Sequence, residues 1–115
     1  MSSLIDQPAV VLRIGRKWRP DMDEDDVYDT ARGWWLIGPR REKCEYAIAV
    51  AKGVVRGVYR IHAWQERPQG EGRPGGRVKW GFDGEPAPKL HYLVGRDVSH
   101  LFTFGAANPV LYLNC

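Results

Sequence analysis

The sequence predicts a domain built mainly of β-strands with a few short helices. Between Tyr46 and Trp64, two apolar segments rich in Val, Ile and Tyr meet at Lys52-Gly53, which is typical of a β-hairpin with a two-residue turn. Several other short apolar segments are bounded by Gly and Pro, and the spacing of their apolar residues favours strands. With 115 residues and no linker, the chain is expected to form a single domain, residues 1–115.

The first elements before the hairpin are a strand and a short helix. Within residues 9–17, every second position from Val10 to Ile14 is apolar and Arg13 and Lys17 are basic, which indicates a half-buried strand. Acidic residues then crowd the stretch 21–29, where they would favour a helix N-terminus, and we expect a helix from about Asp23 to Arg32, ended by Gly33. The acids do not follow the calcium-loop pattern, because Asp26 and Arg32 occupy the places of its glycine and its last glutamate. No metal site is predicted.

In the hairpin, a simple two-residue turn would set the pairing of the strands. The row expected to face the core is Val50 opposite Val55, Ile48 opposite Gly57, and Tyr46 opposite Tyr59, followed by Ile61. Gly57 stands inside a strand, where glycine weakens pairing unless another group approaches closely or the strand bends. A strongly curved sheet, such as a small barrel, is the simplest explanation.

The remaining elements follow the hairpin. A loop is expected at Arg67–Arg77, a short strand at Val78–Phe82, and a turn at Asp83–Pro86. Residues 89–102 combine helical spacing with an interrupting glycine, so one short helix or two turns are expected there. A loop at 105–109 then leads to a final strand at Val110–Leu113.

Charge and composition point to partners rather than to a fold. The net charge is +3, but six of the fourteen acidic residues lie within 21–29, and the rest of the chain has seventeen basic against eight acidic residues, a net charge of +9. Twelve of the basic residues are Arg, whose planar group binds phosphates and base edges. Solvated surfaces can have the same bias. No apolar run is long enough for a membrane span, and no secretion signal is evident, so a cytoplasmic protein with no membrane partner is expected.

Few residues suggest catalysis or a cofactor. Cys44 and Cys115 lack CxxC spacing, so both are expected to be reduced thiols without a zinc site or a disulfide. The three histidines are single, and Ser99 is adjacent to His100 without a nucleophile-elbow motif. A small hydrolase that uses His100 or Asp97 is one alternative, but the residues favour a protein without catalytic residues or cofactors.

Binding residues concentrate in one part of the sequence. Arg32, Trp34, Trp35, Arg40 and Arg41 combine aromatic rings that can stack an exposed base with guanidinium groups that can hold phosphates. Two consecutive tryptophans on an extended segment point to opposite faces, so at most one of them belongs to the core. Burial of both is the competing interpretation.

Four short motifs resemble those of the PUA-like superfamily, which contains the PUA, ASCH, EVE, YTH and SRA domains. They are RGWW at 32–35, YAIAV at 46–50, GVVRGVYRI at 53–61 and NPV at 108–110. The resemblance implies a pseudobarrel of about five or six strands that binds RNA or holds a modified, flipped-out base in an aromatic pocket. It would place Trp34, Trp35 and Trp64 in the pocket wall and Arg40, Arg41 and Arg60 near phosphates.

The sequence therefore predicts a non-enzymatic nucleic-acid-binding domain, with modified DNA slightly preferred over structured RNA. One alternative is a module that binds a protein or a small ligand in the same pocket, and the other is the hydrolase. The sequence does not define the oligomeric state.

Overall fold

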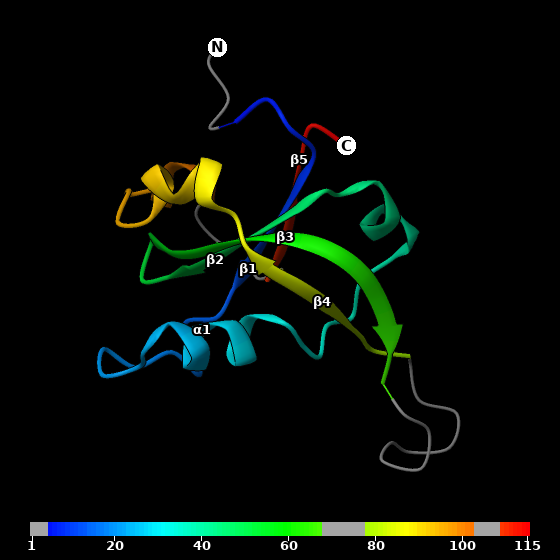
Figure 1. Cartoon of the computed structure of the whole chain (residues 1–115), viewed down its shortest axis with the longest axis horizontal. Helices are drawn as coiled ribbons and strands as arrows, with labels where there is room; N and C mark the ends of the chain where they lie inside the picture. The colour runs from blue at the N-terminus through cyan, green and yellow to red at the C-terminus, as the bar shows by residue number, and fades with distance from the viewer. Residues whose placement is uncertain (1–4, 68–77, 103–108) are drawn as a thin grey trace.

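A computed structural model describes residues 5–67, 78–102 and 109–115, and its strands form a five-stranded mixed sheet in the order β4-β3-β2-β1-β5 (Figure 1). The strands are β1 (Ala9–Arg13), β2 (Tyr46–Ala51), β3 (Val54–Glu66), β4 (Trp80–Pro86) and β5 (Val110–Leu113). The helices are α1 (Glu24–Ala31) and three short 3-10 helices, η1 (Pro39–Lys43), η2 (Pro88–Leu93) and η3 (Ser99–Leu101). The predicted class, mainly β with short helices, is confirmed. Among the described residues no helix has the length and apolar character needed to cross a membrane.

The sheet is covered on both faces rather than on one. β1 and β2 are parallel and are connected through α1, whereas the other strand pairs are antiparallel. Val27 and Ala31 of α1 pack on one face, and Leu90 and Leu93 of η2 pack on the other. Because both faces of the central strands are covered, β1 is a nearly continuous apolar segment, as is usual for buried parallel strands. The sequence indicates a core on one face of the hairpin and allows a helix, a loop or a ligand on the other, and the structure has buried side chains on both faces.

The hairpin turn was predicted correctly, but the strand pairing beyond it was not. Lys52 and Gly53 both have positive φ angles, 55° and 75°, as a two-residue hairpin turn of this kind requires. Val50 pairs with Val55 as predicted, and a β-bulge at Arg56 then shifts the register. The pairs beyond the bulge are Ala49 with Gly57, Ile48 with Val58, Ala47 with Tyr59 and Tyr46 with Arg60.

The bulge has a clear structural basis in the Arg56 side chain. Its guanidinium group lies 3.9 Å from the centre of the Trp18 ring, and its Nε donates a hydrogen bond of 3.2 Å to the Ala51 carbonyl. The extra residue moves Tyr59 to the α1 face of the sheet, where burial raises the pKa of its hydroxyl to about 12. The predicted core row therefore divides between the two faces.

Gly57 is required because the Tyr59 side chain lies against it. A Cβ atom at position 57 would be 2.4 Å from the Tyr59 hydroxyl oxygen and 2.8 Å from the ring carbon that carries it. The close approach expected from a glycine inside a strand is therefore made by a residue of the same strand.

Replacing Gly57 by alanine is expected to lower the free energy of unfolding by about 1–3 kcal/mol, the usual range for overpacking a core. The buried Tyr59 ring would have to move to admit the methyl group. Urea unfolding measures this loss, and Gly38→Ala is the matched control, because no heavy atom outside the neighbouring residues lies within 4 Å of a Cβ at position 38. Equal effects of the two substitutions would contradict the explanation.

The helix prediction is confirmed and part of the β4 prediction is corrected. Asp23 caps α1 by accepting a hydrogen bond of 2.9 Å from the Asp26 amide, and Arg32 follows its last turn. The expected turn at Asp83–Pro86 is instead strand, because β3 is long enough to pair with β4 up to Pro86. Residues 89–102 contain η2 and η3. Most of the expected loops at 67–77 and 105–109 lie outside the described residues.

Candidate nucleic-acid interface

The candidate site lies on the half of the sheet where β3 extends beyond β2. β2 begins at Tyr46, so within the described residues the part of β3 from Ile61 to Glu66 pairs as a strand only with β4. These parts of β3 and β4 form a curved two-stranded ribbon (Figure 1). Directly opposed residues share a face of an antiparallel pair. Trp64 and Phe82 face α1, with their ring centres 5.5 Å apart, and bury one side of the ribbon. The opposite side of the ribbon belongs to the sheet face on which η2 packs, but lies beyond the part that η2 covers.

We call this uncovered side of the β3–β4 ribbon the ribbon face. From β3 it contains Arg60, Ala63 and Gln65, and from β4 it contains Glu85, Asp83 and Gly81. The three β3 side chains are exposed. The ribbon face is therefore an open surface between the middle of β3 and its end.

Trp34 lies over Gly81 on this face. A Cβ atom at position 81 would be 2.8 Å from the Trp34 ring. Because Gly81 has no side chain, the indole can pack directly against the backbone of β4. Trp34 is 40% exposed, and no ring or guanidinium group of the described chain stacks on it. One side of its ring is supported and a large part is open to solvent.

Trp35 points the other way because residues 32–35 run beside β4. The Phe82 amide donates to the Arg32 carbonyl at 2.8 Å, and Trp35 and Trp80 exchange two backbone hydrogen bonds of 2.8 Å. On this extended segment, Trp35 packs against the α1-side core and donates through Nε1 to the Ala31 carbonyl at 2.8 Å. Trp34 is therefore the solvent-facing member of the pair, and the sequence alone could not distinguish the two.

The four arginines predicted to contact nucleic acid have different environments and do not lie together around one site. They are Arg32, Arg40, Arg41 and Arg60. Arg32 pairs with Asp83, which also accepts a hydrogen bond from Gln65. Arg40 stacks 4.3 Å from the Tyr112 ring centre.

Arg41 and Arg60 differ most in exposure. The Arg41 side chain is 11% exposed and stacks 3.5 Å from the Trp80 ring centre, so it serves packing. Arg60 is exposed on the ribbon face and has no acidic or aromatic side chain as a partner in the described ranges 5–67, 78–102 and 109–115. Of the four, Arg60 is the one whose guanidinium group is available for a ligand.

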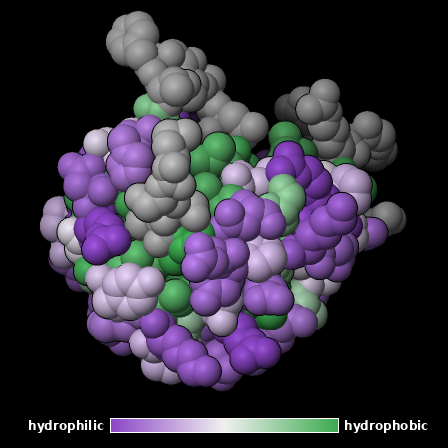
Figure 2. Space-filling view, turned by 90° about the horizontal axis from the view of Figure 1, so that it is seen from above, coloured by the Kyte–Doolittle hydropathy of each residue, from purple (hydrophilic) through white to green (hydrophobic). Residues whose placement is uncertain are grey.

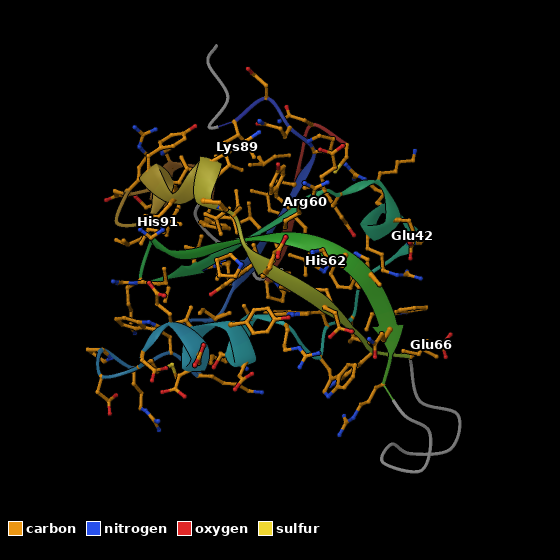
Figure 3. All side chains as sticks on the ribbon, in the orientation of Figure 1. Glu42, Arg60, His62, Glu66, Lys89 and His91 are labelled. Carbon is orange, nitrogen blue, oxygen red and sulfur yellow. The ribbon has the colours of Figure 1, made fainter. Side chains whose placement is uncertain are left out.

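A pocket of about 300 Å³ opens at the edge of the ribbon, between β3 and the segment that leads from η1 into β2. Figure 3 shows Arg60 and His62 on β3 and Glu42 on η1. The residues that line the pocket are Glu42, Cys44, Glu45, Tyr46, Arg60, Ile61, His62, Ala63 and Trp64. Donors and acceptors of both charges meet there, at the lower end of the size range of small-molecule sites.

Trp64 contributes an unused donor beside this pocket. Its Nε1 is buried and has no hydrogen-bond partner within the described residues. Buried polar groups nearly always have a partner, so an unsatisfied donor is unusual here, and in the folded chain this nitrogen is closed to solvent.

Among the residues that line the pocket, Arg60 and Trp64 were predicted from the sequence as site residues, whereas Glu42, Glu45 and His62 were not. His62 is the extra residue of a second bulge and lies 3.3 Å from Glu85, a placement that no local sequence pattern indicates.

The residues of the alternative hydrolase lie elsewhere. The Asp97 carboxylate accepts hydrogen bonds from the Ser99 amide and hydroxyl at 2.8 and 2.6 Å, and these bonds lower its pKa. Asp97 bridges Val54, at the opposite end of β3 from the ribbon. Within the described parts of the chain, no group of three His, Cys, Asp or Glu residues is arranged to hold a metal ion.

Comparison with known protein families, with curated proteins and with solved structures gives no match to this chain.

Proposed function

We propose that this domain binds nucleic acid across the ribbon face, with a base stacked on Trp34 and a phosphate held by Arg60. The single observation that carries the proposal is the exposed Trp34 ring, supported from below by Gly81, on the same face as the unpaired Arg60. Gly81, which lies under Trp34, and Glu85, the strand partner of Arg60, are four steps apart along β4, which corresponds to roughly 13 Å. A short extended segment of nucleic acid can span that distance.

The distribution of charge supports the same partner. The acidic stretch 21–29 includes most of α1, which covers the face of the sheet opposite the ribbon face. The remaining chain has a net charge of +9, which attracts polyanions. Six of the fourteen acidic residues thus lie on or just before α1, on the side of the sheet away from the ribbon face.

The pocket supports a role in holding a base turned out of its stack. The carboxylates of Glu42 and Glu45, which are exposed and line the pocket, can accept hydrogen bonds from the amino groups of a base. We propose that a modified base is one ligand of this pocket.

The PUA-like pseudobarrel belongs to the same proposal. The mixed sheet and the pronounced curvature of β3 support it (Figure 1). We also propose a cytoplasmic location, which the two free thiols support because reducing compartments keep cysteines unpaired.

A salt series on short oligonucleotides tests the proposal. The logarithm of the association constant for single strands, duplexes with plain or modified bases, and structured RNA should fall linearly with the logarithm of the salt concentration. Arg60→Gln is expected to reduce the magnitude of that slope by about 1, because one phosphate contact is lost. Fluorescence anisotropy at several salt concentrations measures it.

Arg96→Gln is the matched control, since Arg96 is an exposed arginine that follows η2 and lies outside the ribbon face. An unchanged slope in the Arg60 variant, or the same decrease in both variants, would remove Arg60 from the interface. Binding of a peptide or a small molecule that is insensitive to salt would favour the alternative module.

A further inference from the structure

The two cysteines meet although 71 residues separate them in sequence. Their Sγ atoms lie 3.3 Å apart. The sheet brings them together because β1 lies between β2 and β5, with Ala9 paired to Tyr46 on one side and to Leu113 on the other. Cys44 comes shortly before Tyr46, and Cys115 comes shortly after Leu113, so both extend from the same end of β1.

Hydrogen bonds fix the backbone on both sides of this pair. The Cys44 amide donates to the Arg41 carbonyl at 3.1 Å. On the other side, Arg40 donates to the Cys115 carbonyl oxygen, and the Asn114 side-chain amide donates to the Ile5 and Gln7 carbonyls at 2.7 and 3.0 Å. The two thiols are therefore held close together by the folded chain.

We propose that Cys44 and Cys115 are an oxidisable thiol pair that forms a reversible disulfide with a small-molecule disulfide such as oxidised glutathione. Such transient disulfides are the kind found in reducing compartments. The bond would tie the last residue of the chain to the segment between η1 and β2, which forms one wall of the pocket. The proposal stands independently of the nucleic-acid assignment.

The reaction has two exchange steps. The thiolate of Cys115, the more exposed of the two, attacks one sulfur of the small disulfide, forms a mixed disulfide and releases one small thiolate. The Cys44 thiolate then attacks the Cys115 sulfur and releases the second small thiolate. Two protein thiols and one small disulfide thus become one protein disulfide and two small thiols.

The environment of Cys44 supports this order. Burial, followed by the hydrogen bond and the charge of Cys115, raises the pKa of the Cys44 thiol to about 12. Cys44 is therefore a poor first nucleophile. Formation of the mixed disulfide removes the charge of Cys115, whose sulfur already lies 3.3 Å from that of Cys44.

The test is oxidation of the folded 115-residue chain by oxidised glutathione, followed by intact-mass and free-thiol measurements. We expect loss of both free thiols in the monomer, with a mass two hydrogens lower and no retained glutathione, and reversal by dithiothreitol. The urea-unfolded chain should form the bond at least about tenfold more slowly, because it lacks the preset proximity.

Two single variants separate the steps. Cys44→Ala should keep one glutathione on Cys115, whereas Cys115→Ser should remain unmodified because Cys44 is buried. The proposal is overturned if the wild-type chain stops at the mixed disulfide, forms only intermolecular dimers, or closes no faster when folded than when unfolded. If the substitution at the buried position prevents folding, the comparison of the folded and unfolded wild-type chains still decides the proposal.

Discussion

Replacing Trp34 by alanine is expected to weaken the binding of a single-stranded oligonucleotide by about 1–3 kcal/mol, or roughly 5- to 150-fold in Kd, with little change in stability. Trp34 offers a ring that is 40% exposed and supported by Gly81. Removing it takes away the stacking surface and leaves the core contacts of Trp35 in place. Fluorescence anisotropy measures the affinity, and urea unfolding confirms that the variant is folded.

The controls for this prediction use other aromatic residues. Trp34→Phe retains a ring and should recover much of the affinity. Tyr92→Ala removes an aromatic side chain that is 62% exposed on η2, outside the ribbon face, and should leave affinity unchanged. Figure 2 views the molecule from above, where η2 lies, and shows apolar side chains among more numerous hydrophilic ones. A similar loss in the Tyr92 and Trp34 variants, or no loss in either, would contradict the stacking role.

Replacing Phe82 by alanine is expected to lower the free energy of unfolding by about 3–5 kcal/mol, the range for truncating a buried phenylalanine. Phe82 is 1% exposed. Its ring centre lies 5.5, 6.1 and 6.3 Å from those of Trp64, Tyr28 and Tyr59, so the substitution opens a cavity in an aromatic cluster. Urea unfolding followed by circular dichroism measures the loss.

Phe82→Leu is the control for volume and should cost less, because it removes fewer atoms and leaves a smaller cavity. A loss below about 1 kcal/mol for Phe82→Ala would mean that the ribbon is not part of the cooperative core. Under conditions where the alanine variant is still folded, its affinity should decrease less than that of the Trp34 variant. Phe82 lies beneath the ribbon face and contacts no ligand there.

Several features of this protein could be predicted from short stretches of sequence. Lys52-Gly53 adopts the expected turn because two positive φ angles suit a glycine-containing pair, and Asp23 caps α1 because its carboxylate reaches the Asp26 amide. The final strand, Val110–Leu113, also lies where its apolar run indicated. In each case the determining contacts are local, within a few residues of chain.

Parts of the candidate site could be predicted in the same way, but not its arrangement. Alternation along an extended segment indicated that Trp34 and Trp35 face opposite sides, and only the packing of Trp35 onto the α1-side core decided which one is exposed. Arg41 was expected to bind phosphate, yet it covers Trp80. A guanidinium group has the same sequence signature in both roles.

What the sequence by itself determined is therefore the class of fold, the turn of the main hairpin and the opposite orientation of Trp34 and Trp35. Only the tertiary structure decided the register beyond Arg56, the burial of both sheet faces, the pocket beside Trp64 and the meeting of Cys44 with Cys115. The physical reason is the range of the interactions. Turns, caps and alternation depend on neighbours in the chain, whereas bulges, pockets and thiol pairs depend on which distant side chains occupy the same space.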